Sequence, residues 1–376
     1  MSAASTSHDD GRGGSGTGGG TESAVPGRTL EPDDLRRPDA PYLRACLGLE
    51  TPQVPMWVMR QAGRYLPEYR ALKEDYDFLT LSQTPELLVE VTLQPLRRFP
   101  MDAAIVFADI MTPLHSMGFE IDFAPGPVIQ NPFRGPGSVP SLREPEPDEI
   151  APFLAEGLRA LAGELPPHQA LIGFSGAPFT LFCYVVEGGG SKDFMSARTL
   201  LRAEPEAAQT LLSALAETQV HYLRMQHEAG ADALMVFDSW VGLLSEADYR
   251  RFAMPHVRRV LQGLADIPAP VTYFPFGGGH LLEAVSELQA DVVGIDWRTP
   301  LSEASRRLGG DKVVQGNLNP AALFAEPDEL RQEAAAVLQE GDRAHGHVFN
   351  LGHGIDRRTD PDQVARLVDF VHGWAR

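Results

Sequence analysis

Residues 211–239 read LLSALAETQVHYLRMQHEAGADALMVFDS and describe one helix followed by one strand. In the first part, apolar side chains recur at the spacing of a helix that packs one face on a core, at Leu211, Leu215, Tyr222 and Met225. Gly230 is suited to end that helix. The run from Ala231 to Phe237 is short and mostly apolar, as a strand buried on both faces of a parallel sheet must be. We therefore expect a buried strand with Asp238 and Ser239 at its carboxyl end.

The same pattern of a short apolar run followed by a helical stretch recurs along the chain and gives eight candidate strands. They are Val54–Met59, Asp102–Phe107, Ala170–Ser175, Ala231–Phe237, Pro270–Phe274, Ala290–Ile295, Lys312–Gln315 and His347–Leu351. Eight alternating units predict a single TIM-type (β/α)8 barrel, whose site lies at the carboxyl ends of the strands. An open, doubly wound sheet is the alternative. It is less favoured because no G-x-G-x-x-G follows the first strand.

One insertion interrupts this order. Residues 118–133, GFEIDFAPGPVIQNPF, alternate apolar and polar side chains around Pro125 and Gly126. This pattern predicts a β-hairpin insertion after the second strand, with a role as a cover or an oligomer contact.

Three helices have recognisable starts. Thr84 before Pro85 predicts an N-cap followed by a proline in the first turn, and Thr299 before Pro300 and Thr359 with Asp362 predict two more N-caps. The helix after the third start has one apolar face, formed by Val364, Leu367, Val368 and Val371.

Charge and composition exclude several classes of protein. The chain has 376 residues with 43% hydrophobic and 22% charged side chains, as in a globular enzyme, and no apolar run is long enough to cross a bilayer. A formal net charge of -19 disfavours nonspecific binding to nucleic acid or anionic lipid, so an anionic ligand needs a local cluster of cations. Cys46 and Cys183 are too few for a disulfide framework or a four-thiolate zinc site. Since no signal peptide is recognisable, a reducing cytoplasm is the expected compartment.

The amino-terminal part differs from the rest. Residues 1–39 include GRGGSGTGGGTES and carry few large apolar side chains, so they cannot offset the entropy of ordering. We expect a disordered glycine-rich tail there and one barrel domain over residues 40–376.

The first candidate strand ends in a cluster of cations. Residues 55–70 read PMWVMRQAGRYLPEYR, so the apolar run stops at Arg60, Gln61 and Arg64. Arginine at both positions favours planar, bidentate binding of a carboxylate or phosphate, and Gly63 lets the backbone close up. A pair of surface arginines beside a turn is the plainer interpretation, but the flanking residues are too apolar for an ordinary solvated loop.

Polar residues also follow the other candidate strands, where they would meet at one end of a barrel. They are Asp109, Tyr184, Asp238, Ser239, Asp296, Asn317 and His353. Asp296 and Asn317 are well explained as caps of the helices that follow them. Asp109 stands between Ala108 and Ile110, where a carboxylate needs a donor or a cationic ligand, and this favours a functional role.

Two of these residues have a structural alternative. Tyr184 is equally well explained as a core tyrosine whose hydroxyl reaches the backbone. The same applies to His353, although Gly352 and Gly354 on either side give its backbone unusual freedom, which favours a site loop.

These residues lie in motifs that resemble those of the uroporphyrinogen decarboxylase family. The two long motifs are PMWVMRQAGRYLPEYR, from Pro55, and GFSGAPFTLFCYVVEGGGSKDF, from Gly173. The shorter motifs are FADI, FDSW, QGNLNP and NLGHG, which begin at Phe107, Phe237, Gln315 and Asn350. The long motifs are highly specific, and the resemblance runs from about Tyr42 to the carboxyl terminus.

The resemblance implies an enzyme that uses no cofactor or metal and converts the four acetate side chains of uroporphyrinogen III to methyl groups, giving coproporphyrinogen III. It also implies a homodimer. The substrate-binding residues that it implies are Arg60, Gln61, Ala62, Gly63, Arg64, Asp109, Tyr184, Ser239 and His353. Among them, Asp109 and Arg60 have the catalytic roles.

Such a substrate requires opposite polarity at its rim and its centre, because eight carboxylates surround four inward pyrrole N–H donors. Arg60, Arg64 and Gln61 suit the rim, and Asp109 suits the N–H groups. Protonation of a ring carbon makes a pyrrolium cation into which the carbon–carbon bond breaks, so a nearby carboxylate stabilises the transition state more than the ground state. Arg60 is a poor acid, and water or a substrate carboxyl are alternative proton donors.

Three other functions remain open at this point. A cobalamin-linked methyltransferase on the same barrel needs a zinc site of the His-x-Cys kind, which this sequence lacks. A noncatalytic tetrapyrrole-binding protein would keep Arg60 and Arg64 without needing Asp109. A hydrolase triad of Ser239, His353 and Asp109 is disfavoured because no G-x-S-x-G surrounds the serine.

Overall fold

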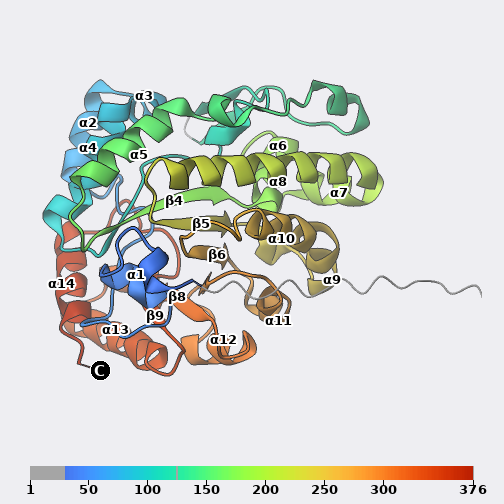
Figure 1. Cartoon of the computed structure of the whole chain (residues 1–376). Coiled ribbons are helices and arrows are strands. Elements are labelled where there is room, and N and C mark those ends of the chain that lie inside the picture. Colours follow the sequence, from blue (N-terminus) through green and yellow to red (C-terminus); the bar gives the residue numbers. More distant parts are fainter. Residues whose placement is uncertain (1–29, 124–125, 376) are drawn as a thin grey trace, which may run out of the picture.

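The fold is built on one curled sheet of seven parallel strands (Figure 1), in a computed structural model that describes residues 30–123 and 126–375. In sheet order the strands are β1 (Ala103–Ile105), β4 (Ala170–Gly176), β5 (Ala233–Asp238), β6 (Val271–Pro275), β7 (Val292–Gly294), β8 (Val313–Leu318) and β9 (His347–Leu351). Each strand pairs in parallel with the next. The carboxyl ends therefore lie at one edge, toward which the arrowheads of β5 and β6 point in Figure 1.

The other predicted strand of the barrel, Val54–Met59, is not a strand within the described residues. Only Met56 forms a bridge, in parallel with Phe349 of β9. Side-chain oxygens take the N–H groups that a ladder would use: Met56 donates to Asp102 (2.7 Å), Val58 to Gln61 (3.0 Å) and Met59 to Asn350 (3.1 Å). The segment still lies between β9 and β1, because the Asp102 N–H donates to the Met56 carbonyl (3.0 Å) and the Trp57 N–H to the Phe349 carbonyl (3.4 Å).

Helices connect and cover the strands. The α-helices of the described residues are α1 (Pro41–Cys46), α2 (Pro67–Asp75), α3 (Phe78–Gln83), α4 (Pro85–Arg98), α5 (Pro152–Glu164), α6 (Pro178–Glu187), α7 (Met195–Ala203), α8 (Pro205–Glu228), α9 (Glu246–Asp248), α10 (Met254–Gln262), α11 (Leu282–Ser286), α12 (Leu301–Arg307), α13 (Pro327–Gly341) and α14 (Pro361–His372). Short 3-10 helices occur at η1 (Pro32–Asp34), η2 (Thr112–Leu114), η3 (Pro136–Ser141), η4 (Pro147–Glu149), η5 (Val241–Leu243), η7 (Gly279–Leu281) and η8 (Pro320–Phe324), and η6 (Tyr249–Ala253) is a π-helix.

The helix patterns in the sequence are largely confirmed. In α8, Leu211, Leu215 and Tyr222 are buried, and the helix lies along β4 (Figure 1). Pro85 stands in the first turn of α4, as predicted. The predicted cap of α14 is wrong by one residue, because Asp360 accepts the hydrogen bond from the Asp362 N–H (3.0 Å).

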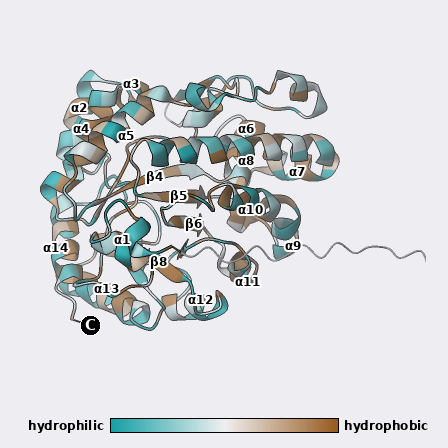
Figure 2. Cartoon of the chain, viewed as in Figure 1, coloured by the Kyte–Doolittle hydropathy of each residue, from teal (hydrophilic) through white to brown (hydrophobic). Residues whose placement is uncertain are grey.

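The hydropathy of the residues differs between the strands of the sheet and the helices around it (Figure 2). Strands β4 and β5 are predominantly hydrophobic, whereas the outer helices alternate hydrophilic and hydrophobic residues along their length. Some polar groups on the strands pair with buried polar groups beside the sheet, as where the Trp57 Nε1–H donates to the Gln315 Oε1 at 2.9 Å. Among the described residues, no helix is both long enough and apolar enough to cross a membrane.

Between β1 and β4 the chain forms a separate antiparallel pair, β2 (Ile121–Phe123) and β3 (Pro127–Ile129). Val128 of β3 also forms an antiparallel bridge with Gly189, which follows α6. The central residues of this insertion, 124 and 125, lie outside the described part of the chain.

The predicted tail over residues 1–39 divides into two parts. Residues 1–29 lie outside the described residues, whereas residues 30–39 are described and include the buried Leu35 and the bonded side chain of Arg37. Arg37 donates hydrogen bonds to three carbonyl groups at the end of α5, those of Ala162 (2.8 Å), Leu165 (3.0 Å) and Pro166 (2.9 Å). It also forms an ion pair with the buried Asp232 (3.0 Å).

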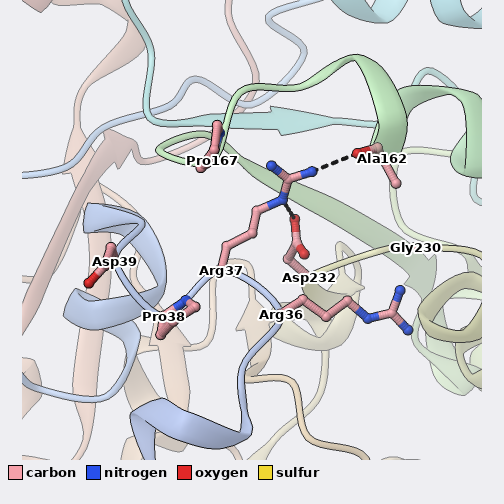
Figure 3. Close-up of a pocket in the computed structure, with 8 residues that line it drawn as sticks. All are labelled: Arg36, Arg37, Pro38, Asp39, Ala162, Pro167, Gly230 and Asp232. Carbon is pink, nitrogen blue, oxygen red and sulfur yellow. Dashed lines mark hydrogen bonds and ion pairs between the residues drawn. The ribbon is translucent and has the colours of Figure 1, made fainter.

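These contacts line a hollow of about 400 Å³ (Figure 3). Asp232 precedes β5, whereas Ser239 follows it, so the hollow lies at the amino ends of the strands, opposite the candidate site. Because the Arg37 guanidinium is already bonded within the protein, we assign these contacts a structural role and call them the clasp.

Candidate active site

Arg60 occupies a strained turn just after the Met56 bridge. Its φ of 63° lies in the left-handed region, which is uncommon for residues other than glycine and is concentrated at functional sites. Arg60 and Arg64 are exposed. Within residues 30–123 and 126–375, neither guanidinium has a hydrogen bond or ion pair. The two arginines are therefore available to bind an anion.

Gln61 holds this turn in place. It is fully buried, its Oε1 accepts from the Val58 N–H (3.0 Å), and its Nε2 donates to the Ala103 carbonyl of β1 (3.0 Å). The Gln61 side chain therefore joins the turn to β1 and stabilises it. Ala62 and Gly63 are half-buried.

Asp109 follows β1 and is half-buried. Its Oδ1 accepts a hydrogen bond from the Met111 N–H at 2.8 Å, and its side chain has no other hydrogen bond to a described residue. Burial raises the pKa of Asp109 to about 6, although the Met111 hydrogen bond and the charge of Arg60 favour the ionised form. The carboxylate is thus ionised at neutral pH, and its second oxygen is available as an acceptor.

His353 lies close to Arg60. A Cβ atom on the adjacent Gly354 would lie 2.5 Å from the Arg60 Cδ, so the arginine side chain crosses that glycine. Neither Gly352 nor Gly354 has a positive φ, and Gly354 is needed for this close approach. Burial, together with the charges of Arg60 and Arg298, lowers the pKa of His353 to about 4. Its imidazole is therefore neutral at pH 7.

Tyr184 of α6 packs against Phe194 and Trp240, with ring centroids 5.5 and 6.1 Å apart. Burial raises the pKa of its hydroxyl, which also responds to the charges of Asp109 and Arg60. The first long motif, the second long motif and the Asp109 loop therefore meet in one place.

Ser239 is half-buried immediately after β5 and next to a network that the sequence did not reveal. The neighbouring Asp238 is buried and accepts hydrogen bonds from the Thr180 Oγ1 (2.7 Å) and the Tyr273 hydroxyl (2.8 Å). The Trp240 N–H donates to the same Thr180 oxygen at 3.3 Å. Burial raises the pKa of Asp238 to about 6. This network fixes the turn that carries Ser239.

Comparison with known proteins shows the family of this chain. Residues 37–374 match the family described as Uroporphyrinogen decarboxylase (URO-D). The chain belongs to the uroporphyrinogen decarboxylase family. The uroporphyrinogen decarboxylase of Frankia casuarinae is 46% identical over 372 residues, which cover 97% of this chain and 99% of that relative. That of Carboxydothermus hydrogenoformans is 46% identical over 333 residues, covering 88% and 95%.

Solved structures show that the uroporphyrinogen decarboxylase fold is shared with other enzymes. A methyltransferase from Methanosarcina mazei superposes with a TM-score of 0.73 at 17% identity, over 90% of this chain and 98% of that one. At so low an identity the likeness concerns the fold alone.

Asp296 and Asn317, which the sequence explained as helix caps, instead brace the loops of this decarboxylase-family site. The Asp296 carboxylate accepts hydrogen bonds from the Gly277 N–H (2.8 Å) and the Arg298 N–H (2.9 Å). The Asn317 Nδ2 donates to the carbonyls of Asp296 (2.9 Å) and Thr299 (2.7 Å). Neither side chain caps the helix that follows it, because the N-cap of α12 is Pro300, not Asp296 or the predicted Thr299, and the N-cap of η8 is Asn319.

Neither cysteine lies in a setting that suits a thiolate. A Cβ atom on Gly346, just before β9, would approach the Ala45 carbonyl to 3.1 Å, so the adjacent Cys46 lies at the amino ends of the strands. Burial raises the pKa of both Cys46 and Cys183. In the described part of the chain, no three His, Cys, Asp or Glu side chains gather as a metal site.

Proposed function

We propose that this chain removes the four acetate carboxylates of uroporphyrinogen III without a cofactor and so forms coproporphyrinogen III. Family membership supports the reaction class. The single observation that supports the mechanism best is the position of Asp109, an ionised carboxylate with an unused oxygen in the electrostatic reach of Arg60. A carboxylate within the electrostatic reach of an unpaired guanidinium suits a ligand with N–H donors at its centre and carboxylates at its rim.

The ring binds with its centre at Asp109. The inner pyrrole N–H groups donate to the free oxygen of Asp109, and the rim carboxylates accept from Arg60 and Arg64. Ala62 and Gly63 bring the backbone close to the rim, and Gln61 acts by holding that turn rigid. The positioning donors toward the remaining substrate carboxylates are Tyr184, Ser239 and the neutral His353.

In the chemical step, a proton adds to the ring carbon next to the one that bears the acetate. The resulting pyrrolium cation accepts the electron pair of the bond to the carboxylate, and carbon dioxide leaves. A proton then adds to the exocyclic carbon to make the methyl group, and the ring carbon loses its proton. Asp109 stabilises the cation more than the neutral ring, which is the differential binding that accelerates a reaction.

We assign to Arg60 the binding of the reacting acetate and the placing of the proton donor. A guanidinium holds its proton up to a pKa above about 12 and is a poor acid, so the proton comes from another group that Arg60 holds in place, such as a protonated carboxyl group of the substrate. Its strained backbone and its contact with Gly354 fix the direction of the side chain.

The same proposal includes the architecture and the setting of the enzyme. The segment Val54–Met59 takes the eighth strand position of a closed barrel, supported by its bonds to Phe349 and Asp102. The β2–β3 pair is a β-hairpin insertion that covers the end of α6. The enzyme works as a homodimer in the cytoplasm.

The alternatives have less support. A cobalamin-linked methyltransferase needs a thiolate site, and Cys46 lies at the wrong end of the sheet. For a hydrolase, a serine must bond to a histidine, but Ser239, His353 and Asp109 share no hydrogen bond in the described structure. A noncatalytic tetrapyrrole-binding protein remains the best competitor.

Anaerobic incubation with uroporphyrinogen III tests the proposal. After oxidation, chromatography should resolve porphyrins with seven, six, five and four carboxylates, and Asp109→Asn should yield little of them. Folded wild-type protein that binds the tetrapyrrole but forms none of these products would instead support the binding function.

A further inference from the structure

A third arginine at the carboxyl end of the sheet is held on an aromatic platform. Arg298 follows β7, and its guanidinium carbon lies 4.2 Å from the ring centroid of Trp297 and 4.9 Å from that of Phe276. The two rings pack together, with centroids 5.8 Å apart. Stacking on aromatic faces suits the planar guanidinium and limits the rotamers that it adopts.

An ion pair orients the same side chain. The Arg298 Nη1 lies 3.2 Å from the Asp296 Oδ2, and the Asp296 side chain is only 4% exposed. Because that carboxylate also accepts from two backbone N–H groups, its position is fixed by the fold. The Arg298 side chain itself is 51% exposed, so donors beyond Nη1 can reach a ligand.

This platform is shared with the candidate active site. The Phe276 ring that carries Arg298 also contacts the His353 ring, with centroids 4.5 Å apart. The two loops touch, since a Cβ atom on Gly352 would lie 2.5 Å from the Trp297 nitrogen. Arg298 is also one of the two arginines whose charge disfavours protonation of His353.

We propose that Arg298 is a specificity residue that binds a rim carboxylate of the tetrapyrrole beside His353, on the side of the site formed by β7. The inference rests on the proposed function. A ligand with eight carboxylates needs more cations than Arg60 and Arg64 supply, and a guanidinium already fixed by stacking loses little freedom on binding.

The chain offers a matched control in Arg358. It repeats the local pattern of Arg298: an ion pair with the aspartate two residues before it (2.9 Å), a hydrogen bond from its own N–H to that aspartate (2.8 Å), and a stacked ring, Phe324 (5.5 Å). Asp356, however, is less buried than Asp296, and the ring beneath Arg358 is the exposed Phe324, not the one that touches His353.

The test compares Arg298→Ala, Arg298→Lys and Arg358→Ala in two assays. In anaerobic turnover of uroporphyrinogen III, Arg298→Ala should raise KM about ten-fold or more, the usual effect of losing a charge-assisted hydrogen bond, and change kcat less than about three-fold. Arg298→Lys should bring KM part of the way back toward the wild-type value, because lysine keeps the positive charge but lacks the planar set of donors of the guanidinium. Arg358→Ala should leave both constants unchanged.

The second assay measures the Kd of the stable octacarboxylate uroporphyrin by quenching of tryptophan fluorescence, and it does not need turnover. Arg298→Ala should raise this Kd by a similar factor, with a smaller difference from wild type at high salt. Unchanged KM and Kd in Arg298→Ala would overturn the inference. Equal increases of KM and Kd in Arg298→Lys and Arg298→Ala, with a lowered Tm in both, would also overturn it, because they would indicate that Arg298 stabilises the fold. If wild type made no product, the proposed function would fail, yet the Kd comparison would still decide the role of Arg298.

Discussion

The side chain of Arg60 crosses the backbone of Gly354, so that a Cβ atom at position 354 would lie 2.5 Å from the Arg60 Cδ and 2.8 Å from its Nε. Arg60 is also one of three non-glycine residues with a positive φ among the described residues. Two separate parts of the chain, the turn after Met56 and the loop after β9, thus fix one guanidinium. That guanidinium lies in the electrostatic reach of Asp109, Tyr184 and His353.

Gly354→Ala should therefore displace Arg60 and lower kcat/KM by about 10²-fold, since small misplacements of binding groups have effects of that size. Steady-state kinetics would measure this. Gly137→Ala is the control, because no atom lies within 4 Å of a Cβ atom at that position, and it should behave as wild type. Full activity in Gly354→Ala would show that the position of Arg60 does not matter.

Asp109→Asn should lower kcat by about 10²–10³, the usual cost of losing one preorganised electrostatic contact. The same change should stabilise the free protein at pH 7 by on the order of 1–3 kcal/mol, because burial raises the pKa of Asp109 and the folded state disfavours its charge. Urea denaturation at pH 7 would measure this gain, with the exposed Asp311→Asn as control. Loss of both activity and stability would mean that Asp109 serves mainly to hold the fold.

The activity should fall in mild acid. Asp109 has a pKa of about 6 in the free enzyme, so lowering the pH through 6 protonates the carboxylate that catalysis needs. The value of kcat/KM, which reports the free enzyme, should decrease below that pH, while His353, with a pKa of about 4, stays neutral. The same decrease should persist in Asp238→Asn, which removes the other carboxyl with a pKa of about 6. A profile flat from pH 7 to pH 5 would contradict the role of Asp109.

Arg37→Ala should destabilise the protein by about 3–5 kcal/mol, because it removes the ion-pair partner of the buried Asp232. Its site lies at the amino ends of the strands, so kcat of the folded enzyme should remain within about two-fold of wild type. Chemical denaturation beside a turnover assay would separate the two effects. As a control, Arg331→Ala removes one partner of the exposed ion pair between Arg331 and Asp328, and it should cost less than about 1 kcal/mol of stability. An equal cost for both variants would show that the clasp contributes no special stability.

The sequence predicted the sheet well because its signal is local. Seven apolar runs became strands, since a strand buried on both faces must be apolar throughout. Val54–Met59 has the same apolar pattern, but its hydrogen bonds go to Asp102, Gln61 and Asn350. Two of these acceptors, Asp102 and Asn350, come from distant parts of the chain, and none of the three leaves a periodic signal in the sequence.

For the site, the sequence indicated which residues meet, but not what each one does there. Gln61 looked like a donor to the ligand and is turned inward to Val58 and Ala103. The flanking glycines of His353 suggested backbone freedom, whereas Gly354 makes room for Arg60. Asp238 was visible as a polar strand end, but its partners Thr180 and Tyr273 depend on how helices pack, which no short motif encodes.

The most direct test of the account is a crystal structure of the protein with coproporphyrinogen III, grown without oxygen. We expect one Asp109 carboxylate oxygen within about 3 Å of the inner pyrrole nitrogens, as in an ordinary hydrogen bond, with Arg60 and Arg64 on the outer carboxylates. A tetrapyrrole bound elsewhere, or one whose nitrogens lie away from Asp109, would contradict it.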